Sequence, residues 1–322
     1  MRKLLALAIC GVLALGAAAC GDDDNSDSSG GGGDSGGNLS GSIAIDGSST
    51  VAPFAQAAQE AFQAENPDVK ITVGTSGTGG GFEKFCAGET DISDASRPIK
   101  DDEEVPVCEK NGVVYDEVQV ANDGIAVVTN TALKVDCLTT AELKKVWNKG
   151  SKVKSLSEVN PKLPDTQLDL FGPGTDSGTF DFFTDVINGE EGVSREDYQP
   201  SEDDNILVQG VEGSDGGLGY FGFSYYEQNA DKLNLVGVDG GDGCVKPSTE
   251  AIQDGSYTPL SRPLFMYPSE KSLKRPEVKA FMDYVIANYT DIATNSQIVP
   301  MTEAQAAKGK KALDTAESNA GA

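Results

Sequence analysis

Apolar and polar positions along the chain follow two spacings, one typical of strands and one typical of helices. The segment 39–46 shows partial strand-like alternation and predicts a strand. Phe54, Ala58 and Phe62 then mark one face of a helix that ends before Pro67. A strand followed by a helix is thus the first predicted unit.

The same order of strand, loop and helix is repeated at once. The segment 69–73 predicts a strand, the glycine-rich stretch 74–81 a loop, and 82–87 a short helix closed by Gly88. This repetition predicts an α/β fold in which ligands bind at the carboxyl ends of the strands.

Two extended passages, near 118–129 and 257–267, bracket the middle of the chain. They predict a middle domain inserted into an outer one through two β-like crossings, so that two lobes can hinge and close over a ligand. We place lobe I at 39–120 and 258–322, and lobe II at 121–257.

Further helices are predicted in both lobes. A capping box between Thr139 and Glu142 opens one of them, and Trp147 near its end is predicted to be a core residue. Near the end of the chain, a single long helix is predicted from an apolar face formed by Phe281, Val285 and Tyr289.

The first 38 residues have the pattern of a targeting sequence and a tether. A basic start and an apolar run precede Cys20, which predicts a signal peptide (1–19) and lipid modification of Cys20. Ala17 stands where lipoprotein signals usually have leucine, so an ordinary signal peptide cleaved nearby is the alternative. The segment 22–38 has no apolar side chain, which makes 20–38 a lipidated cysteine with a flexible linker.

Four further cysteines, Cys86, Cys108, Cys137 and Cys244, form an even set suited to an oxidising compartment. Three pairings are open, and we favour Cys86 with Cys108 and Cys137 with Cys244, because each pair then lies within one predicted lobe. Metal binding is the alternative, but the chain has no histidine and no CxxC motif. We therefore expect no metal and no cofactor.

The formal net charge of −26 restricts the partners of this protein. A surface this acidic repels nucleic acid and anionic lipid. It also repels an anionic ligand, so any anion has to be captured locally, by hydrogen bonds and dipoles in a cleft.

Three polar loops supply that chemistry, at 47–51 (GSSTV), 74–81 (GTSGTGGG) and 171–180 (FGPGTDSGTF), and each precedes a helical pattern. The start of a helix leaves free N–H donors and carries a partial positive charge, which suits a small anion. One such loop is usually only a helix cap. Three loops of the same chemistry predict one shared ligand.

Five motifs in order carry a resemblance to a known family: GSSTVAPF, GTSGTGGGF, DISDASRPI, FGPGTDSGTFDFF and SEDDNILVQGV. Together, and behind a lipoprotein signal, they resemble PstS, the phosphate-binding lipoproteins of phosphate ABC transporters, from about Leu39 to the end of the chain. The resemblance implies a type II periplasmic-binding-protein-like fold, with two lobes joined by two hinge strands. It also implies capture of inorganic phosphate and delivery to the permease subunits.

The resemblance implies a phosphate site as well. Its first loop would contribute the Thr50 hydroxyl and backbone N–H groups that include Val51. Its second would contribute the hydroxyl of Thr78, or of Ser76 if the register shifts. The central loop would contribute the Ser177 hydroxyl and the N–H groups of Gly178 and Thr179. The full predicted set is Ser49, Thr50, Val51, Ser76, Thr78, Ser96, Arg97, Asp176, Ser177, Gly178 and Thr179.

Two positions depart from the family pattern. The family has an arginine where this chain has Pro173, and an aspartate where this chain has Ser96. We hypothesise that Arg97 supplies the positive charge. Asp176 then either accepts the proton of monohydrogen phosphate or holds Arg97 in place. A carboxylate of this kind would reject sulfate, which has no proton to donate.

Several alternatives remain beside the binding-protein reading. The DSGT tetrapeptide at Asp176 matches an aspartic protease signature, but that chemistry needs two such carboxylates and the chain has one copy. A serine hydrolase would lack its histidine, and a P-loop would lack its Gly-Lys-Ser/Thr ending. Another tetrahedral oxyanion could replace phosphate. We expect a monomer without enzymatic activity, anchored by lipid alone at the outer face of the cytoplasmic membrane.

Overall fold

The computed structural model describes residues 39–321. The predicted signal peptide, Cys20 and the linker lie outside the described residues, so these predictions stay untested. Among the residues that are described, no helix combines the length and the apolar character that a membrane crossing requires.

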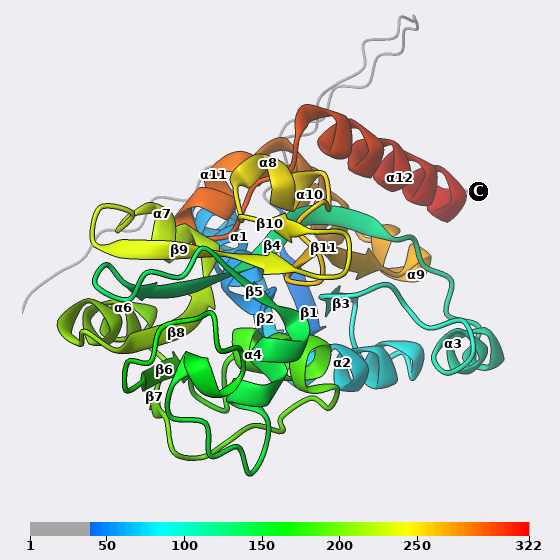
Figure 1. Ribbon diagram of the computed structural model, residues 1–322. Coiled ribbons are helices and arrows are strands. Elements are labelled where there is room, and N and C mark those ends of the chain that lie inside the picture. Colours follow the sequence, from blue (N-terminus) through cyan, green and yellow to red (C-terminus); the bar gives the residue numbers. More distant parts are fainter. Residues whose placement is uncertain (1–38, 322) are drawn as a thin grey trace, which may run out of the picture. The chain divides into compact units, whose positions relative to one another are not determined.

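A continuous path of hydrogen-bonded strands runs through an α/β fold, as the sequence predicted (Figure 1). The strand order is β2-β1-β3-β11-β4-β8-β6-β7, and β9 pairs with β4, β5 and β10. The strands are β1 (Gly41–Gly47), β2 (Val69–Gly74), β3 (Ile92–Ala95), β4 (Val118–Asn130), β5 (Cys137–Thr139), β6 (Asp169–Pro173), β7 (Gln199–Ser201), β8 (Gly217–Gly222), β9 (Leu233–Asp239), β10 (Cys244–Val245) and β11 (Ser261–Pro268).

Helices follow most of these strands. They are α1 (Ala52–Glu65), α2 (Gly77–Cys86), α3 (Val105–Asn111), α4 (Thr140–Trp147), α5 (Gly178–Phe183), α6 (Asp204–Gly213), α7 (Phe223–Glu227), α8 (Thr249–Gln253), α9 (Glu270–Leu273), α10 (Pro276–Ala287), α11 (Tyr289–Asn295) and α12 (Glu303–Gly321). A 3-10 turn, η1 (Leu156–Glu158), and a π-helical turn, η2 (Thr184–Asn188), complete the set.

One hydrophobic core, called the first core, lies between β1, β2, β3 and the helices α1 and α10. It includes the buried residues Ile43, Ile71, Phe54 and Phe281. β1 pairs in parallel with both β2 and β3. The carboxyl ends of these three strands therefore lie at one edge of the sheet.

A separate hydrophobic core, called the second core, gathers residues of β4, β8 and α4 around Trp147. The Trp147 side chain is fully buried, as predicted, and its ring contacts the rings of Phe183 and Tyr220. The capping box at the start of α4 is also present, because Thr139 accepts from the Glu142 N–H and Glu142 accepts from the Thr139 N–H.

One strand, β4, runs from one core to the other, and β11 pairs with it. Val118 of β4 belongs to the first core and Val127 of the same strand to the second. β11 pairs with β4 in antiparallel register, with Arg262 opposite Asp123. The two extended passages predicted to connect two lobes thus lie side by side.

The structure contains the disulfide pairing favoured from the sequence. Cys86 at the end of α2 is bonded to Cys108 in α3, and Cys137 in β5 is bonded to Cys244 in β10. Cys86 and Cys108 are both buried, beside Phe82 and Phe85.

The predicted start of the second helix was wrong. Its glycines favoured a loop up to residue 81, because glycine disfavours a helix by about 1 kcal/mol per residue. The structure begins α2 at Gly77. A Cβ on Gly81 would lie 2.5 Å from the Cα of Gly47, so the glycine allows α2 to pack directly against the end of β1.

The single long helix predicted near the end of the chain is also wrong. The structure has two helices there, α10 and α11, which are separated at Asn288. The Asn288 side chain donates to the carbonyl of Tyr284 and so competes with the helical backbone. The apolar face continues into α11 through Ile292, which explains why the sequence pattern did not show the break.

Candidate functional site

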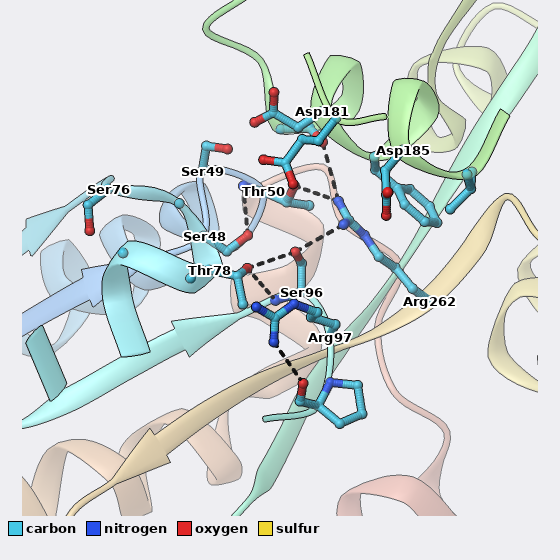
Figure 2. A pocket seen from close by; sticks show the side chains of 18 of the residues that line it. Ser48, Ser49, Thr50, Ser76, Thr78, Ser96, Arg97, Asp181, Asp185 and Arg262 are labelled. Carbon is cyan, nitrogen blue, oxygen red and sulfur yellow. Dashed lines mark hydrogen bonds between the residues drawn. The ribbon is translucent and has the colours of Figure 1, made fainter. Parts of the chain in front are cut away.

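Three segments that follow the strands β1, β2 and β3 of the first core meet at the edge of the sheet where these strands end. β1 leads through Ser49 and Thr50 into α1, β2 leads into α2 with Thr78, and β3 leads to Ser96 and Arg97. The central loop comes from the second-core side, where β6 leads into α5 at Gly178. The site is therefore assembled from segments far apart in the sequence (Figure 2).

A cavity of about 480 Å³ lies where these segments meet. Of the predicted site residues, those that line it are Ser49, Thr50, Ser76, Thr78, Ser96, Arg97 and Gly178. The other lining residues are Ser48, Gly77, Gly79, Gly80, Pro98, Asp181, Phe182, Asp185, Val186, Glu191, Arg262 and Pro263.

Hydroxyl groups of Thr50, Thr78 and Ser96 lie together in this cavity. Thr78 Oγ1 lies 3.1 Å from Ser96 Oγ, and it accepts from the Ser96 N–H at 3.2 Å. Arg262 joins this group, because its Nη1 donates to Ser96 Oγ at 2.9 Å and its Nη2 to Thr50 Oγ1 at 2.7 Å (Figure 2). Three neutral hydroxyls and one guanidinium thus share a single small volume.

Arg262 is the positively charged site residue that the sequence analysis missed. It lies on β11, and only 14% of its side chain is exposed. Asp123 on β4 compensates the charge, with 3.2 Å between its Oδ2 and the Arg262 Nε. Burial lowers the pKa of Arg262, and Asp123 opposes that effect. The sequence does hold a signal: the tripeptide Ser-Arg-Pro occurs at 96–98 and again at 261–263.

Arg97, the predicted charge donor, has a different main partner. Its Nη2 and Nη1 lie 2.8 and 3.0 Å from the two carboxylate oxygens of Glu104. The hydrogen bonds to Glu104 raise the pKa of Arg97. Arg97 lines the cavity with a guanidinium that is already neutralised, whereas the Arg262 guanidinium lies between the hydroxyl groups.

Ser76 lines the cavity, but its hydrogen bonds go elsewhere. Its N–H and its hydroxyl both donate to Asp46 Oδ1, at 3.0 and 2.5 Å. Lys84 lies 2.5 Å from the other Asp46 oxygen. The hydroxyl of Thr78 is therefore the better placed of the two that were predicted from this loop.

Of the site residues predicted from the central loop, only Gly178 lines the cavity. A Cβ on Gly178 would lie only 2.2 Å from Thr50 Oγ1, so the two loops approach each other closely. Ser177 caps α5 by accepting from the Thr179 N–H at 3.2 Å. The cavity lining does not include Val51, Asp176, Ser177 or Thr179, and their roles stay predictions.

Asp176 is exposed, and its N–H donates to Glu202 at 3.3 Å. Three other acidic residues line the cavity: Asp181 at the start of α5, and the exposed Asp185 and Glu191. Burial, with help from Glu191, raises the pKa of Asp181 to about 6, although Arg262 opposes the shift. A carboxyl group with a raised pKa thus lines the same cavity as the Arg262 guanidinium.

Comparison with known proteins supports one interpretation of this geometry. The profile of the PBP superfamily domain matches residues 32–288. Protein SphX of Synechococcus elongatus is 45% identical over 262 residues, which cover 80% of this chain and 77% of that protein. The phosphate-binding protein PstS of Staphylococcus saprophyticus is 43% identical over 251 residues, which cover 77% of this chain and 76% of that protein.

A solved structure also superposes well on this one. The crystal structure of a possible phosphate binding protein from Planctomyces limnophilus is 46% identical in sequence, with a TM-score of 0.82. The match covers 86% of this chain and 99% of that chain. The type II fold with two lobes and two connecting strands, predicted from the sequence motifs, is thereby confirmed.

Proposed function

Because this chain belongs to the PBP superfamily and to the PstS family within it, we propose that it captures inorganic phosphate between two lobes and delivers it to the permease subunits of an ABC transporter. The observation that carries the proposal is the position of Arg262. Its guanidinium lies between Thr50 and Ser96, in a cavity that both the first-core loops and the central loop line.

The chemistry of this cavity suits a tetrahedral anion. Hydroxyl groups and the start of α5 offer neutral donors, and Arg262 offers a positive charge. A hydrogen bond to a charged group contributes about 1.5–3 kcal/mol, so a small number of them supports tight binding. We propose that Arg262 takes the role assigned to Arg97 in the sequence analysis, because both Nη atoms of Arg97 are bonded to Glu104, whereas those of Arg262 are directed to Ser96 and Thr50 and only its Nε to Asp123.

We further propose that Asp181 distinguishes phosphate from sulfate, in place of the exposed Asp176. Asp181 lines the cavity, and the charges that affect it are those of Glu191, Arg262, Asp176 and Glu202. An ionised carboxylate can accept a hydrogen bond from a protonated phosphate oxygen. Sulfate offers it only lone pairs, and an unpaired buried charge costs several kcal/mol.

Lobe closure follows from the two connecting strands. We propose the boundaries given by the sequence analysis, with lobe I at 39–120 and 258–322 and lobe II at 121–257. β4 contributes to both cores, and its partner β11 contributes to the first core and directly follows Leu260 of the second, so bending within this pair would move one lobe relative to the other. The close approach of Gly178 to Thr50 then corresponds to contact between the lobes.

The place of the protein in the cell is part of the same proposal. Proteins of this family act outside the cytoplasm, and a lipid on Cys20 would hold this chain, as a monomer, at the outer face of the membrane. We propose binding without catalysis, since the aspartic protease alternative requires a second carboxylate to share a proton with Asp176.

A ligand screen tests this function. Thermal unfolding and titration calorimetry are performed with phosphate, arsenate, sulfate and molybdate. A ligand at about 100 times its Kd stabilises the folded state by about 2.7 kcal/mol, so phosphate should raise the Tm by several degrees. A response to sulfate or molybdate without one to phosphate would reassign the oxyanion. No response to any of the four would refute the proposed function.

A further inference from the structure

The aromatic ring of Phe182 covers one face of the Arg262 guanidinium. The guanidinium carbon lies 3.8 Å from the ring centroid, well within the range of a cation–π interaction. Phe182 is 7% exposed and lines the same cavity as Arg262. The contact is therefore largely shielded from water.

The hydrogen bonds of Arg262 account for the edge of its guanidinium but not for its faces. Nε is directed to Asp123, Nη1 to Ser96, and Nη2 to Thr50 and to the Gly178 carbonyl at 3.3 Å. Among residues 39–321, the bond to Asp123 is the only ion pair of Arg262, and it is long at 3.2 Å and engages Nε alone. These hydrogen bonds restrain the guanidinium through its edge, and the Phe182 ring adds a contact against one of its faces.

Phe182 and Arg262 come from different parts of the fold. Phe182 belongs to α5, which begins at Gly178, and it packs in the second core. Arg262 belongs to β11, one of the two connecting strands. The contact therefore joins the helix that follows the central loop to one of the two connecting strands.

We propose that Phe182 is a positioning residue that holds the Arg262 guanidinium in the plane from which it meets the phosphate, and so couples the placement of the positive charge to lobe closure. The inference rests on the proposed function. It assigns the ring an electrostatic role that an aliphatic side chain of similar volume cannot perform.

The test compares ring and non-ring side chains at position 182. Titration calorimetry with phosphate should show a Kd about 3-fold to 30-fold weaker for Phe182→Leu, and within about 2-fold of the unmodified protein for Phe182→Tyr. Phe182→Met should weaken the phosphate Kd as much as Phe182→Leu does. The methionine variant is used instead if Phe182→Leu is unstable. In an Arg262→Gln background, Phe182→Leu should add less than about 2-fold, since no cation remains beneath the ring.

Phe180→Leu is the matched control. Phe180 lies on the same helix and is 3% exposed, but it does not line this cavity. Phe180→Leu should lower the Tm about as much as Phe182→Leu does. Its phosphate Kd should stay within about 2-fold of that of the unmodified protein.

Three results would overturn the inference alone. They are equal weakening by leucine and tyrosine at position 182, the same effect of Phe182→Leu in the unmodified protein and in the Arg262 variant, and an unchanged phosphate Kd in Phe182→Leu. Failure of the unmodified protein to bind phosphate would instead overturn the proposed function, and this inference with it.

Discussion

Replacing Gly178 with alanine tests whether the close approach of the two loops is needed for binding. An added Cβ would lie 2.2 Å from Thr50 Oγ1, 2.6 Å from the Thr50 nitrogen and 2.7 Å from Ser49 Oγ. The methyl group would have to be about 1 Å farther away to reach ordinary contact distance. The central loop would then be held away from the first loop.

The expected loss of affinity follows from the distances. A hydrogen bond of about 2.9 Å that is lengthened by about 1 Å no longer qualifies as one. If the central loop loses two charge-assisted bonds to phosphate, the cost is about 3–6 kcal/mol, or about 100-fold to 10,000-fold in Kd. Gly178→Ala should therefore weaken phosphate binding by at least about 100-fold in titration calorimetry.

The same change should leave the unliganded fold intact. Gly178 does not have a left-handed φ, and as the first residue of α5 it is in a position where alanine is favourable. Gly213→Ala is the control, since Gly213 is also helical, has no left-handed φ and has nothing within 4 Å of an added Cβ. Wild-type affinity in Gly178→Ala, or an equal loss in Gly213→Ala, would refute the reasoning.

Three further predictions concern charged side chains. Arg262→Lys should weaken phosphate binding by at least about 10-fold, since an ammonium cannot replace the planar donors of a guanidinium. Arg97→Lys should change the phosphate Kd by less. A larger loss for Arg97→Lys than for Arg262→Lys would show that Arg97 supplies the positive charge. The pKa of Asp181 is about 6, so it is ionised at pH 7.5 and protonated at pH 5. Sulfate binding should therefore strengthen by about 10-fold or more as the pH falls over that range, and Asp181→Asn should bind sulfate without this pH dependence; equal pH profiles for the two proteins would refute the assignment. Asp94 is fully buried, both of its carboxylate oxygens lack a hydrogen-bond partner within residues 39–321, and burial raises its pKa well above the ordinary value. Because the pKa of Asp94 is raised in the folded state, its protonated carboxyl stabilises the fold at low pH, and this stabilisation is lost as the pH rises. The Tm of Asp94→Asn relative to that of the wild type should therefore increase from pH 5 to pH 9. A constant difference in Tm would show that Asp94 does not titrate in this way.

Local patterns in the sequence determined most of the helices and strands and the positions of the polar loops between them. The capping box at Thr139 formed as predicted, because a cap depends on residues only three positions apart. The loops with Thr50 and Thr78 converge because each follows a parallel strand, and the carboxyl ends of parallel strands lie at the same edge. Local chemistry was thus sufficient to predict that these hydroxyl-bearing loops gather at one edge.

Only the tertiary structure decided which charged side chains enter the site. Arg262 is 212 positions away from Thr50, and it reaches Thr50 because β11 pairs with both β3 and β4. Asp176 and Asp181 belong to the same loop and helix, yet only Asp181 lines the cavity. Strand pairing and helix orientation are non-local, so the spacing of residues in the sequence indicates where donors gather but does not tell which arginine and which carboxylate face them.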